Sequence, residues 1–322
     1  MKEKDKGGGR MSARNKIIIS VIAGVAVYAA LSIYADVNEL FIALGNFNWM
    51  YLPLILLLTF LNYVLRFLKW DYYLRCLEIN MSKKSSAGVF LSGLSMSVTP
   101  AKLGEAFKSY LLKELNGVEI SKTVPVVFAE RCTDLIGLII LASIGYSAFK
   151  YGKEVLLITI FVILIAILVI QSKKLCLRLI NSNIPLISNT KVLHNLYGSA
   201  YTLFSIKPLI IAIAISTFSW FFECSALFFV FKGFGLDYPL LLAVFAFSFS
   251  TVAGAVSMIP GGLGVAEGSM TGILVLSGMP KAIAAASTLI IRFCTLWFGV
   301  LIGMLTLFIY GFKIKEAVEW HG

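Results

Sequence analysis

The chain has 322 residues, of which 59% are hydrophobic and 14% are charged, and its mean hydropathy is +0.88. This composition predicts an integral membrane protein and excludes a large soluble domain, because most of the apolar surface has to face lipid. The net charge of +11 does not indicate nucleic-acid binding, since the lysines and arginines lie mainly in short segments between apolar runs, where they set topology. We expect that charge to meet anionic lipid headgroups at the cytoplasmic surface.

The first residues of the chain are basic and rich in glycine. Residues 1–15 therefore predict a disordered, cytoplasmic basic tail. The apolar run that follows is long for the hydrophobic part of a signal peptide, so we expect an uncleaved first helix. Residues 16–312 predict a single membrane domain, and residues 313–322 predict a short cytoplasmic tail.

Hydropathy along the chain predicts an all-α, polytopic membrane protein with six full transmembrane helices. Their approximate ranges are 16–35, 49–70, 123–149, 155–171, 208–231 and 282–310. Two further apolar stretches, 85–115 and 238–277, are too long for one span and are interrupted by proline and glycine. Each is expected to form a re-entrant or broken helical hairpin.

The distribution of lysine and arginine predicts the topology, because positive charge marks the cytoplasmic side. Both termini are then cytoplasmic, and residues 36–48, which lack Lys and Arg, are external. The first hairpin enters from the cytoplasm and the second from outside, so residues 49–149 and 208–310 form an inverted repeat. The alternative, in which every apolar piece crosses completely, gives about eight spans or more.

The centres of the two hairpins share the pattern S-x-x-P-x-x-L-G. It reads Ser97-Val-Thr-Pro-Ala-Lys-Leu-Gly104 in the first and Ser257-Met-Ile-Pro-Gly-Gly-Leu-Gly264 in the second. Proline cannot continue a helix but suits the first turn of a new one, so a half-helix is expected to begin at each break. Its free N–H groups and positive dipole end favour an anion inside the membrane.

The side chains at the two breaks support that interpretation. Thr99 is a plausible cap, Lys102 adds a full charge, and the glycines of the second copy let the backbone approach a ligand closely. A proline kink that only helps helices to pack is the alternative. The break residues expected to hold substrate are Thr99, Pro100, Lys102, Gly104, Pro260, Gly261, Gly262 and Gly264.

Charged residues within the predicted spans are the second indication of a site, since each costs about 2.5 to 3.5 kcal/mol at the centre of a helix. Arg66 lies deep in its span, whereas Lys69 on the same face is near the cytoplasmic end and can snorkel. Glu130, Arg131 and Asp134 lie within one helical turn of each other. They are candidate substrate-binding residues, with a purely structural ion-pair network as the alternative.

Four more charged residues complete the predicted binding site. Glu223 and Arg292 are lone charges in the second half, expected to pair with each other or with Arg66 and Glu130. Glu105 and Glu267 follow the repeated glycine, where they either compensate the helix dipole or carry protons or cations. The five cysteines show no C-x-x-C spacing and only two histidines are present, so no metal or other cofactor is expected.

Four motifs in this order and spacing resemble the lysylphosphatidylglycerol synthase transmembrane region family, whose members are also called flippase-like proteins. They are Arg66-Phe-Leu-Lys-Trp70, the break from Ser97 to Glu105, Ala129-Glu-Arg-Cys-Thr-Asp134 and Ile259-Pro-Gly-Gly-Leu-Gly-Val-Ala-Glu267. The likeness covers about residues 16–312. It implies a lipid-handling domain, which in bifunctional relatives translocates aminoacylated phosphatidylglycerol between leaflets.

Those relatives carry an additional soluble aminoacyltransferase domain that this sequence lacks, so we expect no lipid synthesis and no enzyme activity. Other relatives are associated with polyprenyl-linked sugars. The sequence therefore predicts a flippase-like transporter of an anionic phospholipid or a polyprenyl-phosphate-linked lipid, working by alternating access. A membrane-embedded transferase with Glu105, Glu130 or Asp134 as base, and a non-transporting scaffold, are the alternatives, and a homo-oligomer is left open.

Overall fold

The computed structural model describes residues 13–99, 105–146, 157, 161 and 190–319. All regular structure in these residues is helical, and no strand occurs among them. The predicted helix 155–171 falls outside the described residues apart from two isolated positions, and most of the predicted tail 1–15 also lies outside them.

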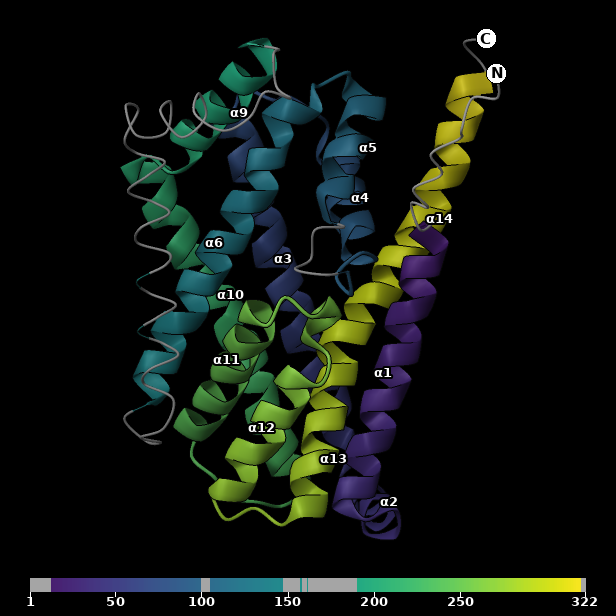
Figure 1. The fold of residues 1–322 in the computed structure, drawn as a ribbon, viewed down its shortest axis with the longest axis vertical. Helices are drawn as coiled ribbons and strands as arrows, with labels where there is room; N and C mark the ends of the chain where they lie inside the picture. Colours follow the sequence, from purple (N-terminus) through teal and green to yellow (C-terminus); the bar gives the residue numbers. More distant parts are fainter. Residues whose placement is uncertain (1–12, 100–104, 147–156, 158–160, 162–189, 320–322) are drawn as a thin grey trace, which may run out of the picture.

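The first described segment is a bent pair of helices, α1 (Ala13–Ala35) and α2 (Val37–Asn46), which meet at an angle of 94°. Asp36 begins α2, because its carboxylate accepts hydrogen bonds from the backbone N–H groups of Asn38 and Glu39. The bend places α2 across the lower end of the molecule (Figure 1). The sequence predicts only an external connection there, and residues 13–15 of the predicted disordered tail are helical.

Three continuous helical segments in the described part of the chain are long and apolar enough to cross a membrane: Trp49–Cys76, Ile206–Gly233 and Lys281–Ile309. The bent pair of α1 and α2 is a fourth if it forms one span. The helix α6 (Ile120–Gly145) has a similar length of 26 residues, but the charges at its centre mean that composition alone does not identify it as a span. The prediction of six full spans in an inverted repeat stays a prediction.

The boundaries of two long helices differ from those predicted. The helix α3 (Leu52–Cys76), preceded by the short turn η1 (Trp49–Tyr51), continues well past the predicted end at residue 70. An ion pair between Asp71 and Arg75, one turn apart, stabilises this extension. The last helix, α14 (Phe298–Glu319), runs into the predicted tail 313–322, which is therefore helical at its start.

Each interrupted apolar stretch forms two short helices. The first contains α4 (Lys83–Leu94) and α5 (Phe107–Asn116). The second contains α11 (Leu240–Val256) and α12 (Val265–Leu276), with the turn η3 (Pro260–Gly262) between them. In Figure 1 the α4–α5 pair lies in the upper half of the molecule and the α11–α12 pair in the lower half.

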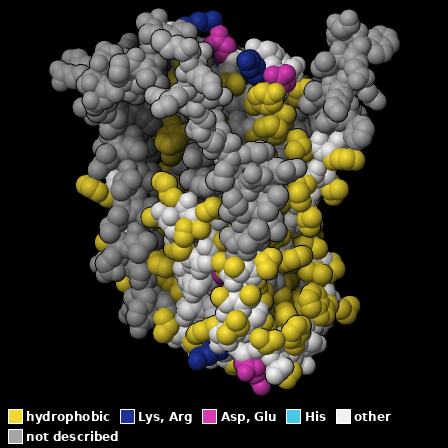
Figure 2. Space-filling model, turned by 45° about the vertical axis from the view of Figure 1, so that its right-hand side comes forward, with side chains coloured by type: hydrophobic (Ala, Val, Ile, Leu, Met, Phe, Trp, Pro, Cys, Tyr) yellow, Lys and Arg dark blue, Asp and Glu magenta, His cyan; other side chains and the backbone are white. Residues whose placement is uncertain are grey.

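The helix α10 (Ile206–Gly233) contacts helices from both the first and the second half of the chain. It packs against α3, α6, α11 and α13 (Lys281–Arg292) and more weakly against α9 (Thr190–Leu203). A turn of π-helix, η4 (Phe293–Trp297), joins α13 to α14, and α14 then packs against α4. Figure 2 shows hydrophobic side chains along the middle of one face and charged side chains mainly at its two ends, the distribution expected of a membrane protein.

Candidate functional site

The acid that follows the first break binds the arginine of α6. An Nη atom of Arg131 lies 3.1 Å from Oε2 of Glu105. The hydroxyl of Ser97, on the other side of the break, donates to Oε1 of Glu105 at 3.4 Å. Glu105 is only 1% exposed, so its ion pair with Arg131 is a buried interaction that links the hairpin to α6.

The second break repeats this pairing. Nε of Arg292 donates to Oε1 of Glu267 at 2.6 Å, and Oε2 of Glu267 accepts the backbone N–H of Gly264 at 2.7 Å. An Nη atom of Arg292 also donates to the carbonyl of Gly261 at 2.8 Å. Gly261 and Gly264 have φ values of 62° and 85°, a region that other residues rarely adopt. In both halves the acid after the break therefore binds the arginine of the next long helix.

Asp134 is the centre of a larger group of charges. Its Oδ1 lies 2.5 Å from Nζ of Lys69, and its Oδ2 lies 3.1 Å from Arg131 and 3.9 Å from Nε of Arg66. Ser216 of α10 donates to Asp134 at 3.1 Å and accepts from Lys69 at 2.7 Å. Lys69 is fully buried. The prediction that it snorkels is wrong, because α3 continues to Cys76 and Asp134 holds the amine inside.

Lys108 is a buried charge that sequence reasoning missed. Its Nζ lies 2.5 Å from Oε2 of Glu130 and 3.8 Å from Oε2 of Glu105. The amine also lies 4.5 Å from the centre of the Trp70 ring, a favourable cation–π distance. A side chain at Gly93 of α4 would lie 2.5 Å from Cγ of Lys108, so the glycine makes room for it. Glu130 therefore binds Lys108, whereas the sequence suggested a partner in the second half.

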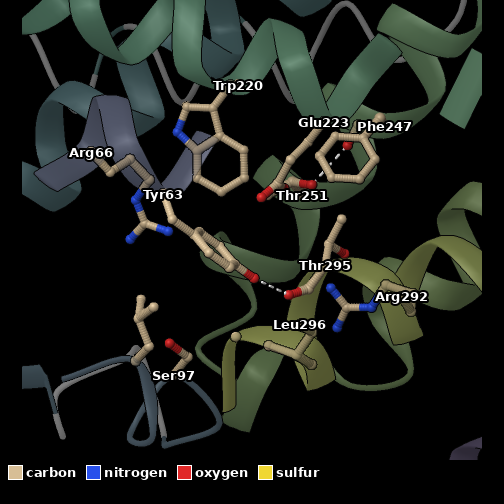
Figure 3. A pocket seen from close by; sticks show the side chains of 12 residues that line it. Tyr63, Arg66, Ser97, Trp220, Glu223, Phe247, Thr251, Arg292, Thr295 and Leu296 are labelled. Carbon is tan, nitrogen blue, oxygen red and sulfur yellow. Dashed lines mark hydrogen bonds between the residues drawn. The ribbon is translucent and has the colours of Figure 1, made fainter. Parts of the chain in front are cut away.

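A cavity of about 50 Å³ lies where the two halves meet (Figure 3). That volume holds a few water molecules. Arg66 of α3 and Arg292 of α13 reach it from different halves of the chain, and Glu223 of α10 lies between them. The cavity is lined by Tyr63, Arg66, Leu94, Ser97, Trp220, Glu223, Phe247, Thr251, Arg292, Thr295, Leu296 and Gly299.

The wall of the cavity contains two unusual polar features. Nε of Arg66 is buried and has no hydrogen-bond partner among the described residues, an arrangement that is costly unless something else binds it. Tyr63 donates to the carbonyl of Thr295 at 2.6 Å, and that carbonyl belongs to η4. Such π-helical turns are frequent at functional sites. Helical spacing could have placed Tyr63 one turn from Arg66, but nothing in the sequence marks η4.

The remaining predicted site residues divide into two groups. Pro260, Gly262 and Thr99 are described, and the hydroxyl of Thr99 donates to the carbonyl of Met96 at 2.7 Å. Pro260 and Gly262 form the turn η3 at the second break. The predicted site residues Pro100, Lys102 and Gly104 lie outside the described residues.

Comparison with known proteins gives a consistent family. The model of the lysylphosphatidylglycerol synthase transmembrane region matches residues 21–303. A UPF0104 membrane protein of Methanothermobacter thermautotrophicus is 25% identical over 319 residues, which cover 92% of this chain and 94% of that protein. A UPF0104 membrane protein of Methanocaldococcus jannaschii is 32% identical over 223 residues, 66% of this chain and 92% of that protein. The chain therefore belongs to the lysylphosphatidylglycerol synthase transmembrane region family.

Proposed function

We propose that the protein moves a lipid with a phosphate headgroup between the leaflets of the membrane. The observation that carries the proposal is the cavity between the two halves, which receives Arg66 from one and Arg292 from the other. The planar fork of a guanidinium matches phosphate oxygens. Because Nε of Arg66 is buried without a hydrogen bond, an entering phosphate would give that donor a hydrogen-bond acceptor.

The path of the chain supports alternating access. In the proposed mechanism, residues 49–149 and 208–310 are two units of an inverted repeat, each with a broken hairpin that enters from its own side. The ion pairs Glu105–Arg131 and Glu267–Arg292 fix each hairpin to its unit. The units then rock against each other around the cavity, while the acyl or prenyl tails of the lipid stay in the bilayer.

The orientation and the partners belong to the same proposal. Both termini lie on the cytoplasmic side, where basic residues attract anionic lipids. The transported lipid is an anionic phospholipid or a polyprenyl-phosphate-linked lipid, and it is moved without chemical conversion. Translocation needs only that the headgroup bind more tightly in the cavity than in the low-dielectric interior around it.

A translocation assay tests the proposal through Arg66. In vesicles containing the purified protein, fluorescent phosphatidylglycerol in the outer leaflet is quenched by a reductant that cannot cross the bilayer, and the protected fraction reports translocation. Arg66→Ala should slow translocation about 10- to 100-fold, because it removes a charged hydrogen bond worth about 1.5–3 kcal/mol.

The matched control is Arg75→Ala, since Arg75 lies on the same helix but has a side chain that is 64% exposed. It should keep the rate of the unmodified protein. An Arg66→Ala protein that folds and translocates at the unmodified rate would refute the site. Conversion of the labelled lipid into a new product would favour the transferase alternative instead.

A further inference from the structure

The helix α2 lies nearly at right angles to α1. The apolar part of α1, residues 17–35, has the length of a transmembrane helix without α2, since about 17–25 residues suffice to cross the hydrocarbon core. A helix at 94° to such a span runs along the membrane surface rather than through the bilayer. Figure 1 shows α2 in this position, across the lower end of the molecule.

Packing contacts hold α2 in that orientation. Leu40 and Ala43 are buried in a cluster with Ala285 of α13. Directly after α2, the backbone N–H of Asn48 donates to the carbonyl of Gly233, at the end of α10, at 2.8 Å. One side of α2 and its C-terminal end are therefore fixed to the protein, and its other sides face outward.

The outward sides of α2 differ in polarity. Successive residues of a helix are separated by about 100° around its axis, so Val37 and Phe41 lie on one side and Asn38 and Glu39 on another. Val37 and Phe41 are 42% and 69% exposed, and Asn38 and Glu39 are also exposed. The apolar, polar and packed sides point in three directions about a third of a turn apart. A helix that lies beside a protein at the membrane surface needs such sides, which face acyl chains, water and protein.

The residues that precede and follow α2 are typical of a membrane–water interface. Tyr34, at the end of α1, and Trp49, at the start of η1, are both exposed. Nζ of Lys281 lies 5.5 Å from the centre of the Tyr34 ring. Tyrosine and tryptophan are enriched where the acyl chains meet the headgroups, so these side chains place α2 at the same level.

We propose that α2 is an interfacial helix that binds the lipid surface, with Val37 and Phe41 among the acyl chains and Asn38 and Glu39 in the headgroup layer. This inference goes beyond the proposed function and does not depend on it. The occupant is lipid because exposed side chains at the end of α1, such as Ile33, meet the same leaflet. Since α2 contains no lysine or arginine, burial of apolar side chains rather than attraction to anionic headgroups holds it there.

Nitroxide labels on single cysteines test the inference in vesicles of phosphatidylcholine. Cys76 and Cys176 are first replaced by alanine, because the other three cysteines are buried, and this background should take up no label. Collisions of the nitroxide with oxygen, which concentrates among acyl chains, are compared with its collisions with a water-soluble nickel chelate. The oxygen-to-nickel ratio should be several-fold higher for Phe41→Cys than for Asn38→Cys, because residue 41 lies about 5–10 Å into the boundary between headgroups and acyl chains.

Ile42 separates the geometry of α2 from its sequence. It is an exposed apolar residue, yet it lies one turn after Asn38 and therefore on the polar side of α2. The label on Ile42→Cys should accordingly give a ratio close to that of Asn38→Cys, the matched control. A ratio closer to that of Phe41→Cys would overturn the inference. All three positions are exposed, so the labelled proteins should keep the circular dichroism of the background.

Three other outcomes would also overturn the inference. Equal and low ratios at residues 38, 41 and 42 would place all sides of α2 in water. High ratios at all three would place α2 within the hydrocarbon core, as the second part of a broken span. A label at residue 41 that neither reagent reaches, with a spectrum broadened by a neighbouring label, would show that a second copy of the chain covers this side. Because the measurement needs no translocation, failure of the proposed function would leave the inference standing.

Discussion

Replacing Arg292 by alanine leaves Glu267 charged and fully buried without its counter-ion. Removing one partner of a buried ion pair costs about 3–5 kcal/mol of unfolding free energy. The backbone N–H of Gly264, 2.7 Å from the carboxylate, is the interaction of Glu267 that remains. We therefore expect Arg292→Ala to be among the most destabilising single substitutions in the protein.

Arg131→Ala, the equivalent substitution in the first half of the chain, should lower the unfolding free energy less than Arg292→Ala does. Without Arg131, Glu105 keeps Lys108 at 3.8 Å and Asp134 keeps Lys69 at 2.5 Å. The side chain of Arg131 is also 18% exposed, so water can reach part of the gap that it leaves. We expect Arg131→Ala to lower the unfolding free energy by about 1–3 kcal/mol, the usual cost of leaving a buried polar group without one of its partners.

Unfolding in mixed detergent micelles with increasing denaturing detergent, followed by circular dichroism, measures both substitutions in one preparation. The double variant Glu267→Ala/Arg292→Ala should cost less than the sum of its two single changes, since no charge is left unpaired. The reasoning is refuted if Arg131→Ala destabilises the protein as much as Arg292→Ala does, or if the double variant is additive.

Two further substitutions use the same unfolding measurement. Gly303→Ala should lower the unfolding free energy by about 1–3 kcal/mol through overpacking, because its Cβ would lie 2.8 Å from backbone atoms at the end of α4. Its control is Gly272→Ala, whose Cβ would have no atom of a neighbouring element within 4 Å and which should not destabilise the protein comparably. Lys69→Met should destabilise by about 1–3 kcal/mol because Asp134 loses its closest cation, whereas exposed Lys113 tolerates the same change within about 0.5 kcal/mol. Equal stabilities of the two lysine variants would mean that the amine of Lys69 reaches water.

The sequence anticipated the breaks at the middle of the two hairpins but not the partners of the charges beside them. Pro260 and the glycines around it predict a break, since proline and positive φ constrain only their own neighbourhood. The pair Glu267–Arg292 joins residues on different helices. Its formation depends on how α12 packs against α13, and no local pattern encodes that packing.

Buried lysines show the same limit. Lys69 near the end of an apolar run has the pattern of a snorkelling residue, and Lys108 has the pattern of an ordinary polar residue on a short helix. Both are enclosed because α6 brings Asp134 and Glu130 within 2.5 Å of their amines. Whether a lysine is exposed or buried depends on the neighbouring helices rather than on its own helix.

By itself the sequence determined that this is an all-helical membrane protein with two proline-and-glycine breaks and charges inside its apolar segments. Hydropathy and backbone restriction are properties of consecutive residues, so they can be read along the chain. Only the tertiary structure decided that the acids beside the breaks bind Arg131 and Arg292, and that Arg66, Glu223 and Arg292 line one cavity. Ion pairs and cavities depend on distances between helices far apart in sequence, which are fixed by packing.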